Sequence, residues 1–156
     1  MIERLDANHL PSEAGTYCLW LRLDAPLPLV VGRQGERTLP PGLVAYVGSA
    51  LGPGGLRARV GRHLRAEKRL RWHIDWLTVQ APVRAVWLRA GHLRLECEWS
   101  AVLRRLPGAA IAWPGFGASD CACAAHLIAV PPEALAEARL ALAPDAIFGE
   151  LDGYDR

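Results

Sequence analysis

One continuous stretch, residues 46–75, constrains the fold most, because a strand end, a glycine-rich turn and a strongly basic segment follow one another there. Apolar residues after the turn recur at i, i+4 and i+8, which predicts a helix with one buried face; they are Leu56, Val60 and Leu64. From Arg57 to His73 the chain carries seven Lys or Arg, two His and one acid. A local positive field of this kind usually binds phosphate groups. The alternative is that the same charged residues only form the solvent-exposed face of a helix.

The positive charge is local, because the whole chain of 156 residues has a formal net charge of only +2. Its 51% hydrophobic and 22% charged residues are typical of a globular protein. No apolar run approaches the roughly 20 residues of a membrane span, and the N-terminus lacks the apolar core of a secretory signal. We therefore expect a cytoplasmic protein without a membrane partner. It should form a single domain over 1–156, with a core at about 12–131 and a C-terminal helix and tail at 132–156.

Short apolar runs separated by Gly and Pro predict a mainly antiparallel sheet. The expected strands are 15–23, 27–32, 43–48, 83–89 and 126–130. Helices are expected from residue 56 through the basic segment, at 70–79, at 95–106, and after Pro131-Pro132 until about Pro144. The last dozen residues resemble a weakly specified tail. The predicted fold is α/β (α+β), with a small, mostly antiparallel central sheet flanked by helices.

The four cysteines suggest thiols or metal ligands, because no secretory signal places them in an oxidising compartment. Cys121, Cys123 and His126 lie close together in the chain, and Cys97 lies far upstream. Thiolate and imidazole groups could hold Zn²⁺ in a tetrahedral site. The C-x-C spacing is tighter than the common C-x₂-C spacing, so the sequence favours small buried thiols over zinc.

Two glycine-containing tyrosine motifs precede the basic segment. Gly15-Thr16-Tyr17 and Tyr46-Val47-Gly48, followed by Arg59 and His63, resemble the GIY-YIG nuclease superfamily. The wider set is similar to a GIY-YIG-like family that is sometimes fused to endonuclease III homologues; it adds Ser49-Ala50, Trp72-His73-Ile74-Asp75, Glu96-Cys97 and the segment 115–121. This resemblance covers about residues 15–130 and implies a GIY-YIG-like fold.

The resemblance also implies a catalytic set. It assigns water activation to Tyr17 or Tyr46, the essential arginine to Arg59, and a further histidine to His63. A phenol has a pKa near 10, so it would need a cation nearby to act as a base at pH 7. The structural alternative is that both tyrosines are buried strand residues with satisfied hydroxyl groups and that His63 lies at the edge of the core.

The same resemblance implies a single metal-binding glutamate on the helix expected at 95–106. Glu96 is favoured because Trp99 follows it at the family's spacing, and Glu98 remains the alternative because both flank the apolar stripe. The expected cofactor is one Mg²⁺ or Mn²⁺ ion, since Mg²⁺ in phosphate chemistry often takes only one or two carboxylates. A capping role at the helix N-terminus is the structural alternative for either glutamate.

Other basic side chains are candidates for sequence-independent contacts with the nucleic-acid backbone; they are Arg57, Arg62, Arg65, Lys68 and His73. The sequence therefore predicts a divalent-metal-dependent endonuclease that hydrolyses phosphodiester bonds in DNA, such as branched or damaged DNA, in repair or recombination. The first alternative is a non-catalytic nucleic-acid-binding module with the same fold. The second is a zinc protein whose cysteines form the functional centre.

Overall fold

A seven-stranded sheet forms the centre of the computed structural model, which describes residues 2–119 and 121–151. In spatial order its strands are β1 (Ile2–Glu3), β9 (Ala146–Gly149), β6 (Val83–Ala90), β2 (Gly15–Leu23), β5 (Gly42–Ala50), β8 (Leu127–Ala129) and β7 (Ala110–Ile111). Neighbouring strands are antiparallel except β1 and β9, which are parallel. β3 (Leu27–Val30) and β4 (Glu36–Leu39) pair with each other in a separate small sheet.

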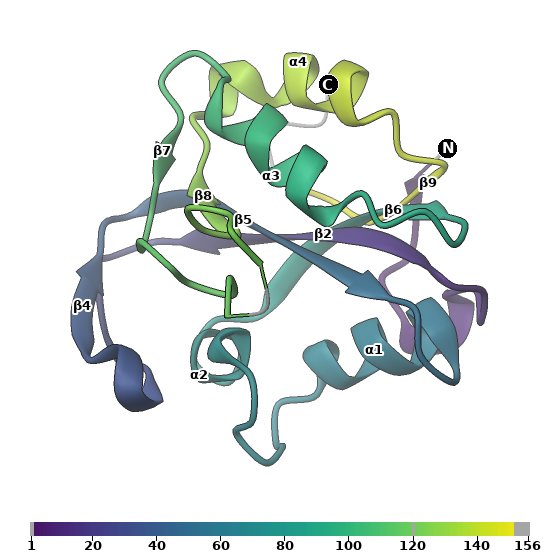
Figure 1. Cartoon of the computed structure of the whole chain (residues 1–156), viewed down its shortest axis with the longest axis horizontal. Helices are drawn as coiled ribbons and strands as arrows, with labels where there is room; N and C mark the ends of the chain where they lie inside the picture. Colours follow the sequence, from purple (N-terminus) through teal and green to yellow (C-terminus); the bar gives the residue numbers. More distant parts are fainter. Residues whose placement is uncertain (1, 120, 152–156) are drawn as a thin grey trace.

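Helices cover both faces of the large sheet (Figure 1). One face carries α1 (Gly55–Leu64) and α2 (His73–Thr78), and the other carries α3 (Glu96–Arg104) and α4 (Leu135–Leu142). Short 3-10 helices are η1 (Ala7–His9), η2 (Gly32–Gln34) and η3 (Pro132–Ala134). The predicted α+β fold, a mostly antiparallel sheet between helices, is confirmed.

The central strand β2 is buried on both sides, which explains its nearly continuous apolar sequence. Tyr17, Leu19 and Leu21 belong to the core that α1 and α2 cover. Cys18 and Trp20 face the second core, which α3 and α4 cover. Because successive side chains of a strand point to opposite faces, two helical layers leave neither set in water.

The basic segment is not one helix, so that part of the prediction is wrong. α1 ends at Leu64, and Arg65 is extended, with φ −71° and ψ 134°. The Lys68 ammonium group donates to the carbonyl oxygens of Arg62, at 3.2 Å, and His63, at 2.8 Å. These bonds satisfy acceptors that the end of a helix leaves unpaired. The helix expected at 70–79 is also shorter and begins at His73.

The C-terminal part contributes a strand to the sheet, which corrects the prediction of a weakly specified tail. β9 pairs with β6, and Ile147, Phe148 and Leu151 are buried. The core therefore extends well beyond residue 131. Residues 152–156 of the predicted tail, and Asp120 of the segment 115–121, lie outside the described residues.

Within the described ranges, no helix is both long enough and apolar enough to cross a membrane.

Candidate active site

A cavity of about 410 Å³ opens beside the ends of β2 and β5. The side chains that line it come from these strands, from α1, from the segment before α2, from the first turn of α3 and from the loop between β7 and β8. All five residues predicted to be catalytic are in its wall; they are Tyr17, Tyr46, Arg59, His63 and Glu96.

Tyr17 and His63 form a buried hydrogen-bonded pair, with 2.7 Å between Oη and Nε2. The two residues are 1% and 2% exposed. Gly48, the partner of Tyr17 across the β2–β5 ladder, makes room for the ring, because a Cβ there would lie 2.4 Å from Oη. The second tyrosine motif therefore needs a glycine for a steric reason, because the missing Cβ lets the Tyr17 ring lie against β5.

Burial sets the charge of this pair. It raises the pKa of Tyr17 well above its usual range, Tyr46 adds to the rise, and Arg59 opposes it. Burial also lowers the pKa of His63 to about 3, and Lys68 contributes to the decrease. The phenol and the imidazole are therefore both neutral at pH 7.

Tyr46 forms the next part of the wall. Its ring meets Phe116 edge-on, with centroids 6.1 Å apart, and His63 in the same manner at 6.3 Å. Gly117 packs against it with φ +73°, and a Cβ there would lie 2.8 Å from Cε1 of Tyr46. Burial, and secondarily the charge of Glu96, raise the pKa of Tyr46 above its usual range.

Three guanidinium groups lie over the indole of Trp72, and that of Arg71 is the most distant, with Cζ 5.4 Å from the ring centroid. The Cζ atom of Arg59 lies 4.4 Å from the ring centroid, and that of Arg62 lies 4.3 Å from it. Arg62 is also bound to the buried carboxylate of Asp75, at 2.7 and 2.8 Å. Among the described residues Arg59 forms no salt bridge. Its stacked guanidinium group therefore keeps donors for an anion in the cavity.

Glu96 and Glu98 differ clearly in position. Glu96 lies in the first turn of α3 and in the cavity wall, where Oε2 is 4.0 Å from Nδ1 of His126 and Oε1 is 3.0 Å from Nη2 of Arg94. Glu98 is exposed and is not among the residues that line the cavity. An oxygen ligand for a hard cation is therefore offered by Glu96.

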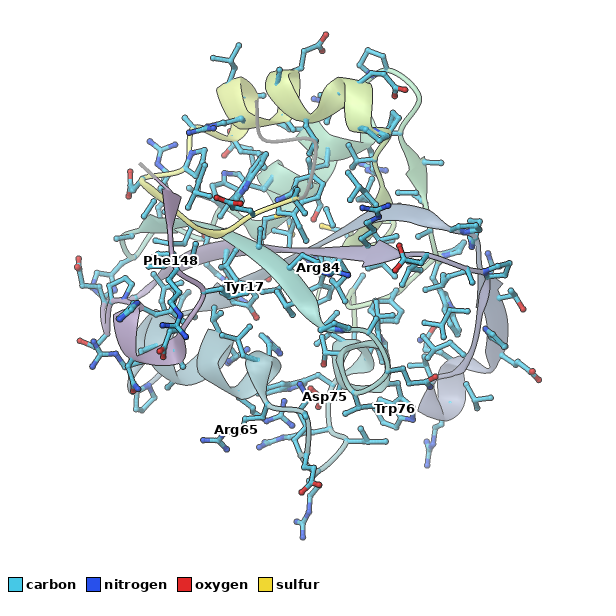
Figure 2. All side chains as sticks on the ribbon, turned by 180° about the vertical axis from the view of Figure 1, so that it is seen from behind. Tyr17, Arg65, Asp75, Trp76, Arg84 and Phe148 are labelled. Carbon is cyan, nitrogen blue, oxygen red and sulfur yellow. The ribbon has the colours of Figure 1, made fainter. Side chains whose placement is uncertain are left out.

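The predicted backbone-contacting residues also have internal partners. Arg57 donates to the Leu10 carbonyl oxygen at 2.8 Å, and His73 Nδ1 accepts from the Gly117 amide at 2.8 Å. Burial lowers the pKa of His73 and that of Lys68, the latter to about 8. Arg65 is exposed and projects from the outer side of the α1–α2 layer (Figure 2).

Four further residues of the cavity wall were assigned no site role in the sequence analysis; they are Ser49, Arg71, Trp72 and Arg94. Trp72 falls within the helix expected at 70–79, but it precedes α2, packs against the core and lies under the guanidinium group of Arg59. Ser49 directly follows the second tyrosine motif, and this position was the available signal. Arg94 lies shortly before α3, and the sequence pattern gives no signal for a site residue there.

A second group of polar side chains adjoins the cavity. The ligand atoms of Cys97, Cys121, Cys123 and His126 all lie within 4.8 Å of one another. Burial raises the pKa of the Cys123 thiol to about 12, with contributions from hydrogen bonds to Cys97 and Cys121. The structure thus brings together the four residues that the sequence analysis disfavoured as a zinc site. This Cys/His cluster could bind a metal ion, and sulfur and imidazole donors suit Zn²⁺ better than Mg²⁺.

Comparison with known proteins gives one match. A family model described as Domain of unknown function DUF123 matches residues 16–146. Searches of curated proteins and of solved structures gave no match. The matched range includes both tyrosine motifs except Gly15, together with the residues that line the cavity and the Cys/His cluster.

Proposed function

This chain belongs to the family described as Domain of unknown function DUF123, and we propose that it is a divalent-metal-dependent endonuclease that hydrolyses phosphodiester bonds in DNA. The observation that carries the proposal is the convergence of two phenols, a guanidinium group, an imidazole and a single carboxylate on one cavity. These groups come from β2, β5, α1 and α3, and 79 positions separate Tyr17 from Glu96. A purely structural role would not require them to face the same space.

Arg59 is placed to bind the scissile phosphate. Its planar fork can donate to two nonbridging oxygens at once, and the Trp72 ring beneath it fixes the plane of the guanidinium group. Charge on the phosphate oxygens increases toward the transition state, so a preorganised cation at this position lowers the barrier.

The donor set suits one Mg²⁺ or Mn²⁺ ion. Glu96 would hold it through a carboxylate oxygen, and substrate and water oxygens would supply the other ligands, as is usual for Mg²⁺ at phosphate. Ser49 Oγ, a buried oxygen of the cavity wall that has no hydrogen-bond partner among the described residues, adds a further oxygen ligand. Such an ion, when bound, lowers the pKa of a coordinated water and neutralises charge on the phosphate.

The tyrosines orient the attacking water. When the Tyr17 hydroxyl group donates to Nε2 of neutral His63, its oxygen can accept one hydrogen bond from the Arg59 side chain and another from that water. Because burial raises the pKa of both phenols, neither is ionised in the free chain. A phenol would act as a base only with a cation close to its oxygen, which explains why Arg59 and a metal ion belong in the same cavity.

The test is cleavage of supercoiled plasmid and of branched DNA in Mg²⁺ or Mn²⁺. Removing one preorganised donor to the transition state costs about 10²–10³ in rate, so Arg59→Ala should lower cleavage by that factor. Arg139→Ala is the matched control, because Arg139 is an exposed arginine on α4, on the opposite face of the sheet. Equal cleavage by Arg59→Ala and Arg139→Ala would contradict the proposal.

A non-catalytic nucleic-acid-binding module is the second candidate, and the neutral state of both phenols favours it. Phosphate contacts alone give an affinity that falls steeply with salt concentration. Salt-dependent DNA binding without cleavage in any divalent metal would select this candidate.

A further inference from the structure

The Cys/His cluster joins two parts of the chain that are remote from each other in sequence. Cys97 lies in the first turn of α3, whereas Cys121 and Cys123 belong to the loop of residues 112–126 between β7 and β8. The described residues of this 15-residue loop, 112–119 and 121–126, contain no strand or helix. Loops of that length without secondary structure are uncommon in compact domains unless they have a function or are fastened.

The separations within the cluster suit one tetrahedral metal ion. With Zn–S near 2.3 Å and Zn–N near 2.0–2.1 Å, two sulfur ligands lie about 3.8 Å apart and a sulfur and a nitrogen about 3.6 Å apart. The ligand atoms here are within 4.8 Å of one another, and Cys121 Sγ lies 3.3 Å from His126 Nε2. Adjustments of about 1 Å or less would centre all four on one ion.

His126 is already oriented as a ligand. It is 1% exposed, and its Nδ1 lies 3.1 Å from the carbonyl oxygen of Val47. A carbonyl oxygen can only accept, so Nδ1 is the donor in this contact, and in the matching neutral tautomer the lone pair is on Nε2. That lone pair faces Cys121. Metal-ligating histidines commonly donate their other N–H to a carbonyl group or a carboxylate in this way.

The backbone fixes the same imidazole. The His126 amide donates to Phe116 O at 2.7 Å, and the Val47 amide donates to His126 O at 3.1 Å. His126, at the end of this loop, is therefore held against β5 by its backbone and its ring, and the three thiols of the first turn of α3 and the loop lie around its Nε2.

From these contacts we propose that the chain binds one structural Zn²⁺ ion through Cys97, Cys121, Cys123 and His126. Four protein ligands close the coordination sphere, so the ion has no open position for water or substrate. It fastens the start of α3 to the loop that carries Gly117, which packs on Tyr46. A role of the ion in positioning Glu96, the residue before Cys97, for catalysis rests on the proposed nuclease function. The metal site itself does not.

The ion should stabilise both segments together. Zinc binding to a site that does not exist in the unfolded chain adds to folding free energy. Removal of zinc would release the first turn of α3 and the loop, and with them the position of Glu96 in the cavity wall.

The experiment measures metal content in protein that is purified under reducing conditions without added zinc. We expect one zinc per chain by elemental mass spectrometry, and loss of it in Cys97→Ser, Cys121→Ser and Cys123→Ser. Cys18→Ala is the matched control, because Cys18 is the fourth cysteine and is buried in β2 within the core that α3 and α4 cover. It should keep its zinc.

Cobalt replacement keeps the test independent of variants that fail to fold. Wild-type protein stripped with a chelator should melt at a lower temperature than the zinc-bound protein, and added Co²⁺ should give the thiolate-to-cobalt charge-transfer band and the intense visible bands of a tetrahedral site. Substoichiometric zinc together with no such spectrum would overturn the proposal. So would a mass two hydrogens lower, which would indicate a disulfide within the cluster.

The two proposals fail separately. Glu96→Gln should lose metal-dependent cleavage and keep its zinc. Zinc-loaded protein that never cleaves DNA would overturn the nuclease proposal alone. DNA cleavage by wild-type protein that carries no zinc and gives no tetrahedral cobalt spectrum would overturn the zinc proposal alone.

Discussion

Gly48→Ala tests whether the close approach of Tyr17 to β5 is a requirement of the site. The new Cβ would lie 2.4 Å from Oη, 2.5 Å from Cζ and 2.9 Å from Cε2 of Tyr17. Distances this short force the ring to move, but the ring is 1% exposed and its hydroxyl group is bound to His63 at 2.7 Å. The substitution should therefore disturb both packing and the hydrogen bond.

The magnitude follows from these two effects. Overpacking a buried site costs about 1–3 kcal/mol, and leaving the buried hydroxyl group or imidazole unpaired costs a further ~1–3 kcal/mol. The same ring movement causes both, so they are not fully additive. The better strand propensity of alanine offsets about 0.5–1 kcal/mol. We expect the free energy of unfolding to fall by roughly 2–4 kcal/mol.

The assay is equilibrium unfolding in urea followed by circular dichroism, with Gly52→Ala as control. Gly52 also lines the cavity, but a Cβ there would have no atom of the described residues within 4 Å, so the free energy of unfolding of Gly52→Ala should change by about 1 kcal/mol or less. If Gly48→Ala lost no more than about 0.5 kcal/mol, the usual range for surface substitutions, the steric account of the tyrosine motif would be wrong.

Three further predictions concern charge. Burial lowers the pKa of His63 to about 3 in the folded chain, so between pH 3 and about 6.5 the unfolded chain binds more protons than the folded chain. The free energy of unfolding should therefore decrease as the pH falls through that window, by at most about 1.4 kcal/mol per pH unit. Titrating the unfolding free energy of His63→Asn should show a shallower slope, and an unchanged slope would contradict the assignment. Asp75→Ala should lower the free energy of unfolding in urea by about 3–5 kcal/mol, because it leaves Arg62 with an unpaired charge. Asp24→Ala removes an exposed ion pair and should lower it by about 1 kcal/mol or less. Similar losses in the two variants would contradict a buried ion pair between Arg62 and Asp75. Arg65→Ala should reduce the slope of log affinity for DNA against log salt concentration by about 1, and an unchanged slope would show that Arg65 contacts no phosphate.

Sequence alone predicted the parts of the fold in which local pattern and tertiary structure agree. The apolar run of β2 and the i, i+4 stripe of α1 are such parts, because burial dictates both. The helix beyond Leu64 was wrong because charge pattern does not reveal where a helix ends: here Lys68 folds back onto the final carbonyl groups. β9 was missed because four residues after Pro144 give little periodicity, and its partner β6 lies far away in the chain.

The residues of the site were also only partly predictable from local sequence pattern. Tyr17, Arg59 and Glu96 were selected through a family resemblance, and their common cavity depends on long-range pairing that no local pattern contains. The Cys/His cluster was undervalued because Cys97 is remote in sequence. Only the packing of α3 beside the loop of residues 112–126 brings it to His126.

The most direct test of the central claim is single-turnover cleavage of supercoiled plasmid in Mg²⁺ by Glu96→Gln and Glu98→Gln, two neutral substitutions on the same turn of α3. The account predicts a loss of about 10²-fold or more for Glu96→Gln, whose side chain lines the cavity, and a rate close to wild type for Glu98→Gln, whose side chain is exposed. Equal rates for the two variants, or no cleavage by the wild-type protein in any divalent metal, would contradict it.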